Sequence, residues 1–516
     1  MQNTTILDSE KVKKIIPKKI VVIGSGIGGL GTAALLAKAG HDVTIYEKNE
    51  RIGGRASLWK KDGYTFDMGP SWYMMPDIFE HFFRLLGEDV NELLELERLS
   101  PSYRIFFEGQ DSHLDFYSDF QKNAEIFESI EPGSSTKLFH HLERGKYQYE
   151  VARREFMFKN YDKVTDFFTK RIATEGRKLP LFSSMEKIVN SQFDSPILQK
   201  VLQYQTVLLG TAPNKCPGIY SLMNHIDMNE GIWYPKGGLY AVTEALIAIC
   251  EKHGVTIHTN SPVARIESAN GTVQGITLHD GTAVESDIVV SNADLTHTDL
   301  ELLGKERSER SSRYWDKKIM SPSGFIMYLG VDGPIDSLDH HNLYFLEDWE
   351  KGNAQVFNSK TLPKNPSFYL CCPSKTDSSV APKGKENLFL LVPIPFGAKY
   401  TEDELKEYEG TMIEHVSKTM NIPNLAKRIE VSRTFCVDEF IADYNAYKGN
   451  ALSGMAHSLT QTAFFRPNNK HKNIDNLYFA GAGTNPGIGV PICLISAELV
   501  YKRVAGITDP EPLFSL

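Results

Sequence analysis

The hydrophobic pattern near the start of the chain predicts a strand, a helix and a second strand in direct succession. Residues Lys19–Ile23 form a β-branched apolar run, which is typical of a buried strand. The alanine- and leucine-rich stretch after Gly29 predicts a helix that is capped by Gly40. A second strand is expected over Asp42–Tyr46, directly before Glu47. Together these segments predict a βαβ unit.

Further apolar patterns predict elements far along the chain. Asp62–Trp72 alternates like a strand and closes in a Gly69-Pro70 turn, and Gly231–Gly254 reads as a Tyr-Pro turn, a glycine pair and an amphipathic helix. Residues 255–268 predict a strand, a loop and a strand. Asp280–Asp294 predicts a turn and a buried strand, and Asn476–Gly506 a strand, a glycine-rich loop and a helix.

Composition narrows the class of protein. The 516 residues suffice for two or more domains, and 41% hydrophobic with 23% charged residues is ordinary for a soluble globular protein. A formal charge of −9 argues against nucleic-acid binding. Six scattered cysteines indicate reduced thiols in a cytoplasmic protein, without a zinc site or disulfides. The first residues lack the apolar core of a signal peptide, and no run of about eighteen apolar residues could span a membrane.

The glycines of the βαβ unit indicate a dinucleotide site. Gly24 allows a tight turn, Gly26 lets the backbone approach a pyrophosphate, and Gly29 lets the helix and strand pack closely. The start of the helix offers free N–H groups and a positive dipole end to phosphates. Glu47, at the end of the second strand, can accept both ribose hydroxyls of an adenosine.

A second glycine pair, Gly53-Gly54, and Arg55 follow Glu47 closely. They suit a second backbone approach to a pyrophosphate, to which the arginine adds a fork of donors. This extended signature resembles that of FAD-containing oxidoreductases, whereas NAD dehydrogenases generally lack it. The predicted nucleotide is therefore FAD, bound noncovalently.

Several blocks together resemble the bacterial-type phytoene desaturases and related carotenoid desaturases, over nearly the whole chain. These blocks are the first module, "DGYTFDMGPSW", "GIWYPKGG", "SNAD", "LCCPSKTDSSVAP", "DYNAYKGNALSGMAHSLTQTAFFRPNN" and "GAGTNPGIGVP". The resemblance implies an α/β fold, with a Rossmann-like FAD-binding domain and a mixed-sheet substrate domain with a helical layer. We expect the FAD domain to comprise 15–103, 231–307 and 471–516, and the substrate and membrane-facing domain to comprise 104–230 and 308–470.

The resemblance also implies cofactor-binding positions. They are Gly24, Ser25, Gly26, Ile27, Gly28, Gly29, Glu47, Lys48, Gly54, Arg55, Gly69, Pro70, Ser71, Val263, Gly483, Thr484 and Val490. One departure affects the last loop, where many relatives have His-Pro-Gly and this chain has Asn485-Pro486-Gly487. We expect polarity and proton handling to differ there if this position faces the flavin.

The implied reaction is desaturation of an acyclic carotenoid, either phytoene or a later intermediate. A hydroxycarotenoid 3,4-desaturase would catalyse one form of this reaction. FAD would take a hydride from one carbon while the neighbouring carbon loses a proton, but the sequence identifies no catalytic base. Oxygen and a quinone both remain open as electron acceptors. A carotenoid isomerase, a retinoid saturase and a flavin amine oxidase are alternatives. A prenyl-lipid-binding protein without catalysis is disfavoured by the intact glycines, Glu47 and Arg55.

Three other features of the sequence each allow two interpretations. His340-His341 could bind a metal, but neighbouring strand residues point to opposite faces, so we expect none. Cys371-Cys372 fits core packing better than a redox pair. The Arg144–Lys178 stretch carries ten Lys/Arg against five acids, with several aromatics. It indicates either a membrane-surface patch, which we favour because the substrate would come from a bilayer, or a solvated helix face.

Overall fold

A parallel sheet of five strands forms one half of the molecule. The computed structural model describes residues 16–163, 179–180, 183–452, 454–462 and 465–516. The strand order is β19-β13-β1-β2-β9, and every neighbouring pair is parallel. The strands are β1 (Lys19–Ile23), β2 (Asp42–Tyr46), β9 (Thr256–His258), β13 (Ile288–Ser291) and β19 (Leu477–Phe479). Because β1 lies at the centre with both faces covered, it needs a continuous apolar run.

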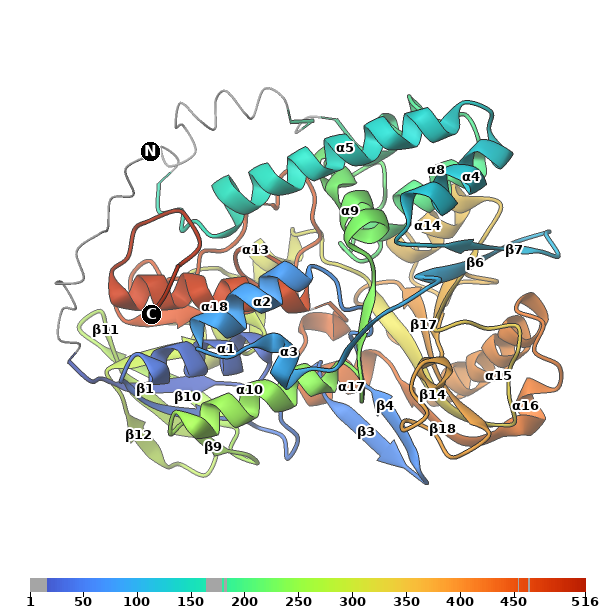
Figure 1. Cartoon of the computed structure of the whole chain (residues 1–516). Coiled ribbons are helices and arrows are strands. Elements are labelled where there is room, and N and C mark those ends of the chain that lie inside the picture. The colour runs from blue at the N-terminus through green and yellow to red at the C-terminus, as the bar shows by residue number, and fades with distance from the viewer. Residues whose placement is uncertain (1–15, 164–178, 181–182, 453, 463–464) are drawn as a thin grey trace, which may run out of the picture.

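Helices cover one face of this sheet and a small antiparallel sheet covers the other. Ile20 and Val22 of β1 pack in a cluster with α1 (Ile27–Lys38), α10 (Tyr240–Lys252) and α18 (Val490–Ala505). Val21 and Ile23 point the other way, toward β10 (Val263–Ala269), β11 (Thr272–Leu278) and β12 (Ala283–Glu285). Helix α2 (Pro76–Leu85) packs on α18, as Figure 1 shows.

The other half contains a mixed sheet of seven strands in the order β18-β14-β17-β16-β15-β6-β7. The strands are β6 (Tyr103–Phe107), β7 (His113–Phe116), β14 (Ser323–Asp332), β15 (His341–Phe345), β16 (Phe368–Cys371), β17 (Lys385–Ile394) and β18 (Ile429–Phe435). The β15–β6 pair is parallel, and the other pairs are antiparallel.

Helices also pack against both faces of the mixed sheet. Helix α15 (Glu402–Thr419) packs on one face through Tyr408, Met412 and Val416. The other face meets a helical layer, which lies above the sheet in Figure 1. That layer contains α4 (Phe120–Ile130), α5 (Ser134–Ala152), α7 (Met185–Asn190), α8 (Pro196–Gln203) and α9 (Leu222–His225). No helix among the described residues is long and apolar enough to cross a membrane.

Two antiparallel pairs of strands and several short helices complete the fold. The pairs are β3 (Leu58–Lys61) with β4 (Tyr64–Asp67), and β5 (Leu96–Arg98) with β8 (Trp233–Pro235). The short helices are α3 (Val90–Leu93), α11 (Leu295–His297), α12 (Gly304–Arg307), α13 (Ser312–Asp316), α14 (Trp349–Phe357), α16 (Leu425–Arg428) and α17 (Val437–Tyr444).

The predicted Tyr-Pro turn is wrong in one detail. Tyr234 and Pro235 lie in strand β8, and the turn follows at the glycine pair. The reason is their antiparallel pairing with Glu97 and Leu96 of the neighbouring strand. Asp67 then fixes the turn, because its carboxylate accepts the backbone N–H of Leu239 at 2.8 Å and of Tyr240 at 2.9 Å. A Cβ on Gly238 would lie 2.4 Å from this carboxylate, so the approach requires glycine.

The predicted α/β class, with a parallel nucleotide-binding sheet and a mixed sheet under helices, is confirmed. All strands of the parallel sheet fall within 15–103, 231–307 and 471–516. The strands of the mixed sheet fall within 103–116 and 323–435. The division of the chain into two domains at the predicted boundaries stays a prediction.

Candidate active site

The turn between β1 and α1 is built from glycines packed around one side chain. Gly24 has a φ of +91°, which favours glycine. A Cβ on Gly26 or Gly28 would lie 2.8 or 2.7 Å from the side chain of Asn292, and one on Gly29 would lie 2.1 Å from the Gly24 carbonyl oxygen. Among the residues that the structure describes, no side chain caps the start of α1 at Gly26. The first N–H groups of the helix therefore remain available to an anion in the cavity beside them.

Glu47 is held in place by two neighbours. Its Oε2 accepts the N–H and the hydroxyl of Ser25 at 2.8 and 2.7 Å, and its Oε1 accepts the N–H of Asn49 at 2.9 Å. The residue is 5% exposed and lines the cavity. A carboxylate has about four acceptor positions, so Oε1 can also accept a ribose hydroxyl.

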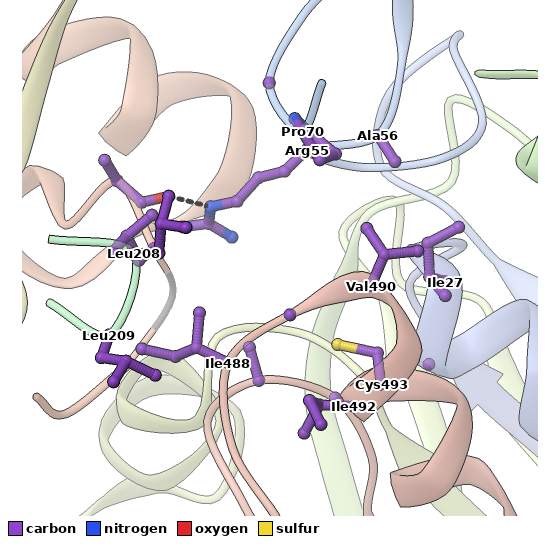
Figure 2. A pocket seen from close by; sticks show the side chains of 18 of the residues that line it. Ile27, Arg55, Ala56, Pro70, Leu208, Leu209, Ile488, Val490, Ile492 and Cys493 are labelled. Carbon is purple, nitrogen blue, oxygen red and sulfur yellow. Dashed lines mark hydrogen bonds between the residues drawn. The ribbon is translucent and has the colours of Figure 1, made fainter. Parts of the chain in front are cut away.

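The second glycine pair lies against the first. Gly53 forms a bridge with Gly26, and a Cβ on Gly54 would lie 3.4 Å from the Cα of Gly26. Arg55 donates through Nε to Ala451 O at 2.8 Å, as drawn in Figure 2, and through Nη2 to Asn450 O at 3.1 Å. Burial lowers the pKa of Arg55, and the nearby Asp294 raises it. The glycine cradle, the uncapped helix and this fixed cation fit the pyrophosphate of FAD.

One cavity of about 1520 Å³ joins this region to the mixed sheet and the helical layer. Most of the predicted cofactor residues line it: Gly24, Gly26, Ile27, Gly28, Glu47, Lys48, Gly54, Arg55, Gly69, Pro70, Ser71, Val263 and Val490. Figure 2 shows Ile27, Val490, Pro70 and Arg55 around one part of it. That these residues contact FAD stays a prediction.

Four predicted residues lie outside the described lining: Ser25, Gly29, Gly483 and Thr484. Ser25 is fully buried and turned toward Glu47. Gly29 lies under the Gly24 carbonyl. Thr484 donates its hydroxyl to Pro467 O at 2.8 Å. The structure therefore places the side chain of Ser25 behind the cavity wall, where it supports Glu47.

The rest of the cavity is mainly apolar. Its lining includes Met74, Met75, Leu208, Leu209, Leu222, Met223, Ile226, Phe345, Trp349, Phe368, Tyr369, Phe389, Ile488 and Ile492. These residues come from the mixed sheet, the helical layer, the segment before α2, the start of α14, the loop before α18 and the first turn of α18. Such a lining suits a long apolar molecule.

Sequence reasoning missed two residues of this region. Asn292 donates to Ala480 O at 3.0 Å and fills the space that Gly26, Gly28 and Gly481 leave open. Its place directly after a buried parallel strand is a signal that could have found it, because ligands bind at the carboxyl ends of such strands. His457 also lines the cavity, and nothing in its local sequence marks it.

The two histidines do not point apart as expected. The rings of His340 and His341 lie 4.5 Å apart, and both approach Cys371, with possible ligand atoms of the three within 4.8 Å of one another. Strand β15 begins at His341, so His340 precedes it and strand alternation does not apply. The geometric argument against a metal at this pair is therefore wrong.

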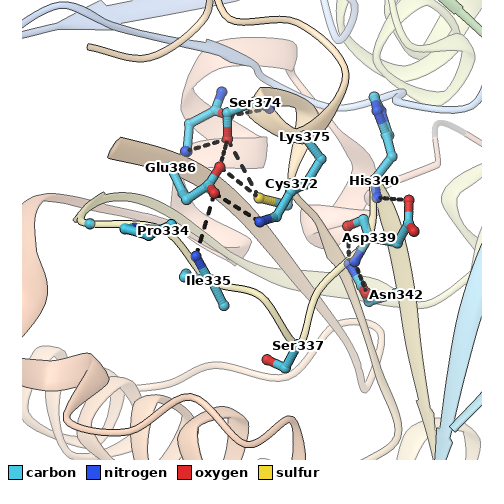
Figure 3. Close-up of polar contacts among 12 residues, drawn as sticks. Pro334, Ile335, Ser337, Asp339, His340, Asn342, Cys372, Ser374, Lys375 and Glu386 are labelled. Carbon is cyan, nitrogen blue, oxygen red and sulfur yellow. Dashed lines mark hydrogen bonds and ion pairs between the residues drawn. The ribbon is translucent and has the colours of Figure 1, made fainter. Parts of the chain in front are cut away.

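Cys371 and Cys372 lie on opposite faces of the mixed sheet, and both thiols are free. Figure 3 shows Cys372 beside Glu386 and Ser374, and Lys375 pairs with Glu386 at 2.9 Å. Burial raises the pKa of both thiols. This placement agrees with the core interpretation of the two residues.

Comparisons with known proteins agree with this geometry. Residues 27–504 match the model of the family described as flavin containing amine oxidoreductase. A carotenoid 3,4-desaturase from Haloarcula japonica is 41% identical over 480 residues, which cover 93% of this chain and 96% of the relative. The chain belongs to this flavin-containing family, in the group of carotenoid desaturases. The predicted FAD cofactor is thereby confirmed.

Two further comparisons describe the same group and fold. A zeta-carotene-forming phytoene desaturase from Myxococcus xanthus is 34% identical over 492 residues, which cover 94% of each chain. The crystal structure of an oxidoreductase from Methanosarcina mazei has a TM-score of 0.61 at 18% identity, over 94% of this chain and 100% of that chain. At that identity the likeness shows the fold alone.

Proposed function

We propose that this flavoprotein is a carotenoid desaturase that introduces C=C bonds into an acyclic carotenoid, by 3,4-desaturation near one end. The relative from Haloarcula japonica, 41% identical, supports this bond position. Both relatives are named as desaturases, which supports desaturation as the reaction. The observation that carries the proposal is the cavity that joins the nucleotide-binding turn to a large apolar space.

The size of this cavity supports two ligands. A pocket for one drug-sized ligand measures about 300–1,000 Å³, and this cavity measures about 1520 Å³. The turn at Gly24–Gly28 and Glu47 suit the nucleotide end of FAD. The apolar remainder leaves space for a second, hydrocarbon molecule, whose burial would be favourable at about 25 cal/mol per Å² of apolar surface.

The side chains of the wall can orient a polyene and exclude water. FAD, when bound, supplies the acceptor for the hydride. Trp72 is fixed by stacking on His341, with ring centroids 4.3 Å apart, and Phe345 stacks on Trp349 at 5.2 Å. Rigid aromatic faces hold a flat chain in one orientation and tolerate positive charge that develops along it.

We further propose that the protein works in the cytoplasm at the surface of a membrane, from which it takes its substrate. Leu459 and Phe465 line the cavity and are 42% and 59% exposed, which supports a mouth at this point. Part of the predicted basic stretch, including Phe156, Met157 and Lys159, also lines the cavity. The six free cysteines suit a reducing compartment.

The basic stretch itself is partly neutralised. Arg153 pairs with Asp77 at 2.8 Å, and Arg154 with Glu155 at 2.9 Å. Residues 164–178, with Lys170 and Arg171, lie outside the described residues. The apolar mouth is therefore a stronger basis for membrane contact than the charge of this stretch.

Pigment analysis tests the proposed reaction. We would express the chain in hosts that accumulate phytoene, lycopene or a 1-hydroxylated acyclic carotenoid, and compare extracts with and without it. The proposal expects a new pigment that absorbs at longer wavelength and has lost two hydrogens per new bond by mass spectrometry. Unchanged pigments in all three hosts, with peroxide released from amines by the purified protein, would instead identify an amine oxidase.

A further inference from the structure

The apolar part of the cavity contains few groups that could accept the proton lost in desaturation. The carboxylates of the described lining are Glu47, Asp294 and Asp443, which lie at the nucleotide end. Burial raises the pKa of five of the lining tyrosines, so these five keep their protons: Tyr149, Tyr204, Tyr220, Tyr344 and Tyr369. Among the described lining residues away from the nucleotide end, the one histidine is His457.

The hydrogen bonds of His457 fix its tautomer. Its Nδ1 lies 3.2 Å from the carbonyl oxygen of Leu209. Because a carbonyl oxygen only accepts, Nδ1 must carry the hydrogen, and the lone pair of the neutral ring is on Nε2. Nε2 makes no hydrogen bond with the described part of the chain. The structure thus holds a neutral imidazole with its basic nitrogen free.

That nitrogen faces the loop before α18. A Cβ on Gly487 would lie 2.4 Å from Nε2 of His457, so the ring lies directly against this loop. The neighbouring residues Asn485 and Ile488 line the cavity. Leu209 and Ile488, both labelled in Figure 2, also line the cavity. The loop itself has Asn485-Pro486-Gly487, without a titratable side chain, and His457 brings an imidazole to it from another segment.

The surroundings keep the imidazole neutral. Burial, and then the charge of Arg466, lower the pKa of His457 to about 3. The other titratable group that faces the ring is Tyr220, whose ring stands edge-on at 5.4 Å. A weak base suffices, because a C–H bond beside a carbocation is a far stronger acid than an imidazolium. A weak base also releases its proton readily.

We propose that Nε2 of His457 accepts the proton that the substrate loses, which makes it the catalytic base of the reaction. The proposal rests on the proposed function. One carbon loses a hydride, which that function assigns to FAD. The C–H bond of the neighbouring carbon then breaks, its electron pair becomes the second bond of the new C=C, and the proton binds Nε2. The imidazolium gives this proton to water at the mouth beside Leu459 when the product leaves.

Chemical rescue tests this role. The variant His457→Ala, prepared as the FAD-loaded protein, should desaturate the carotenoid identified by pigment analysis about 10²- to 10⁴-fold more slowly. Its FAD content and its carotenoid binding should equal those of wild type. Added imidazole should restore part of the rate, whereas pyrrole, which has the same shape and no basic nitrogen, should not. His140→Ala, on the exposed surface of α5, is the control and should not respond to imidazole.

Other outcomes would overturn the proposal. An undiminished rate in His457→Ala, or equal rescue by pyrrole, would show that the ring only fills space. If the variant does not fold, His457→Gln can keep the bond to Leu209 while lacking the base, and it should be equally slow. Nitrogen-15 spectra of the wild-type holoprotein should show Nε2 unprotonated at pH 7, and a protonated Nε2 would also overturn it. A wild-type protein that desaturates no carotenoid contradicts the proposed function instead.

Discussion

Ser25 donates both its backbone N–H and its hydroxyl to one carboxylate oxygen of Glu47, at 2.8 and 2.7 Å. The serine is fully buried between Gly24 and Gly26, and the glutamate directly follows the parallel strand β2. This pair therefore connects the glycine turn, predicted to bind the pyrophosphate, to the residue predicted to bind the ribose. It also fixes the direction in which the carboxylate faces the cavity.

The first prediction concerns Glu47→Ala. The substitution removes charge-assisted hydrogen bonds to the ribose that are worth about 1.5–3 kcal/mol, so FAD affinity should fall by about 10- to 150-fold. Titration of the apoprotein with FAD, followed by flavin fluorescence, measures this. Glu50→Ala is the matched control, since Glu50 is exposed on the same loop. Equal FAD affinity in Glu47→Ala and wild type would show that Glu47 does not bind the ribose.

How much of the fold could be predicted depends on the distance between partners in the sequence. The first strand, the second strand and Glu47 were predicted residue by residue, because periodicity and glycine positions are local signals. Helix α1 ends at Lys38, just before Gly40 with its positive φ, as the sequence indicates.

The site could be predicted only in part, for the same reason. The position of Asn292 between Gly26 and Gly481 depends on the pairing of β13 with β1 and with β19, two strands that are distant from it in the chain. Nε2 of His457 is free because the other ring nitrogen bonds to the carbonyl oxygen of Leu209, 248 residues away in the chain. Local pattern contains no information about such pairings, so the sequence identified the cofactor and left the base unnamed.

The second prediction concerns packing in the glycine turn. A Cβ at Gly29 would lie 2.1 Å from a backbone oxygen that cannot rotate away, so Gly29→Ala should destabilise the protein by about 3 kcal/mol and reduce bound FAD. The control Gly410→Ala places its Cβ in open space on α15. It should stabilise that helix by about 0.5–1 kcal/mol. Unfolding in urea and the FAD content of both variants check this. Equal stability of the two variants would contradict the packing of Gly29 under Gly24.

The third prediction concerns the pH dependence of stability at Asp227. This fully buried carboxylate accepts bonds from Tyr103 at 2.9 Å, Tyr204 at 3.0 Å and Gln205 at 2.8 Å. Burial nevertheless raises its pKa from 3.8 to about 6. Between these values the folded state binds more protons than the unfolded state. Its unfolding free energy therefore falls as the pH rises from 4 to 7, by on the order of 2–3 kcal/mol.

The variant Asp227→Asn removes this titration. Its stability relative to wild type should rise between pH 4 and pH 7, whatever the absolute effect of the substitution at pH 4. Unfolding in urea at four pH values measures the difference. Asp194→Asn is the control, because the side chain of Asp194 is 95% exposed. A difference between Asp227→Asn and wild type that does not change with pH would contradict the raised pKa.

The fourth prediction concerns the membrane. If the cavity opens to lipid beside Leu459 and Phe465, the double variant Leu459→Glu with Phe465→Glu should lose most of its binding to liposomes, because two charges would have to enter the bilayer interface. The control is Phe139→Glu on α5, where the phenylalanine is 48% exposed and does not line the described cavity. All three proteins should keep FAD, because the nucleotide end lies elsewhere.

Flotation with anionic and neutral liposomes at low and high salt separates the apolar contribution from the electrostatic one. Binding through the apolar mouth should persist on neutral vesicles and at high salt. At 1 M salt the screening length is about 3 Å, so salt weakens the attraction between charges but not the apolar contact. Loss of binding at high salt would assign the contact to basic residues. If the double variant floats as well as wild type under all conditions, Leu459 and Phe465 do not contact the lipid, and the substrate enters the cavity at another point.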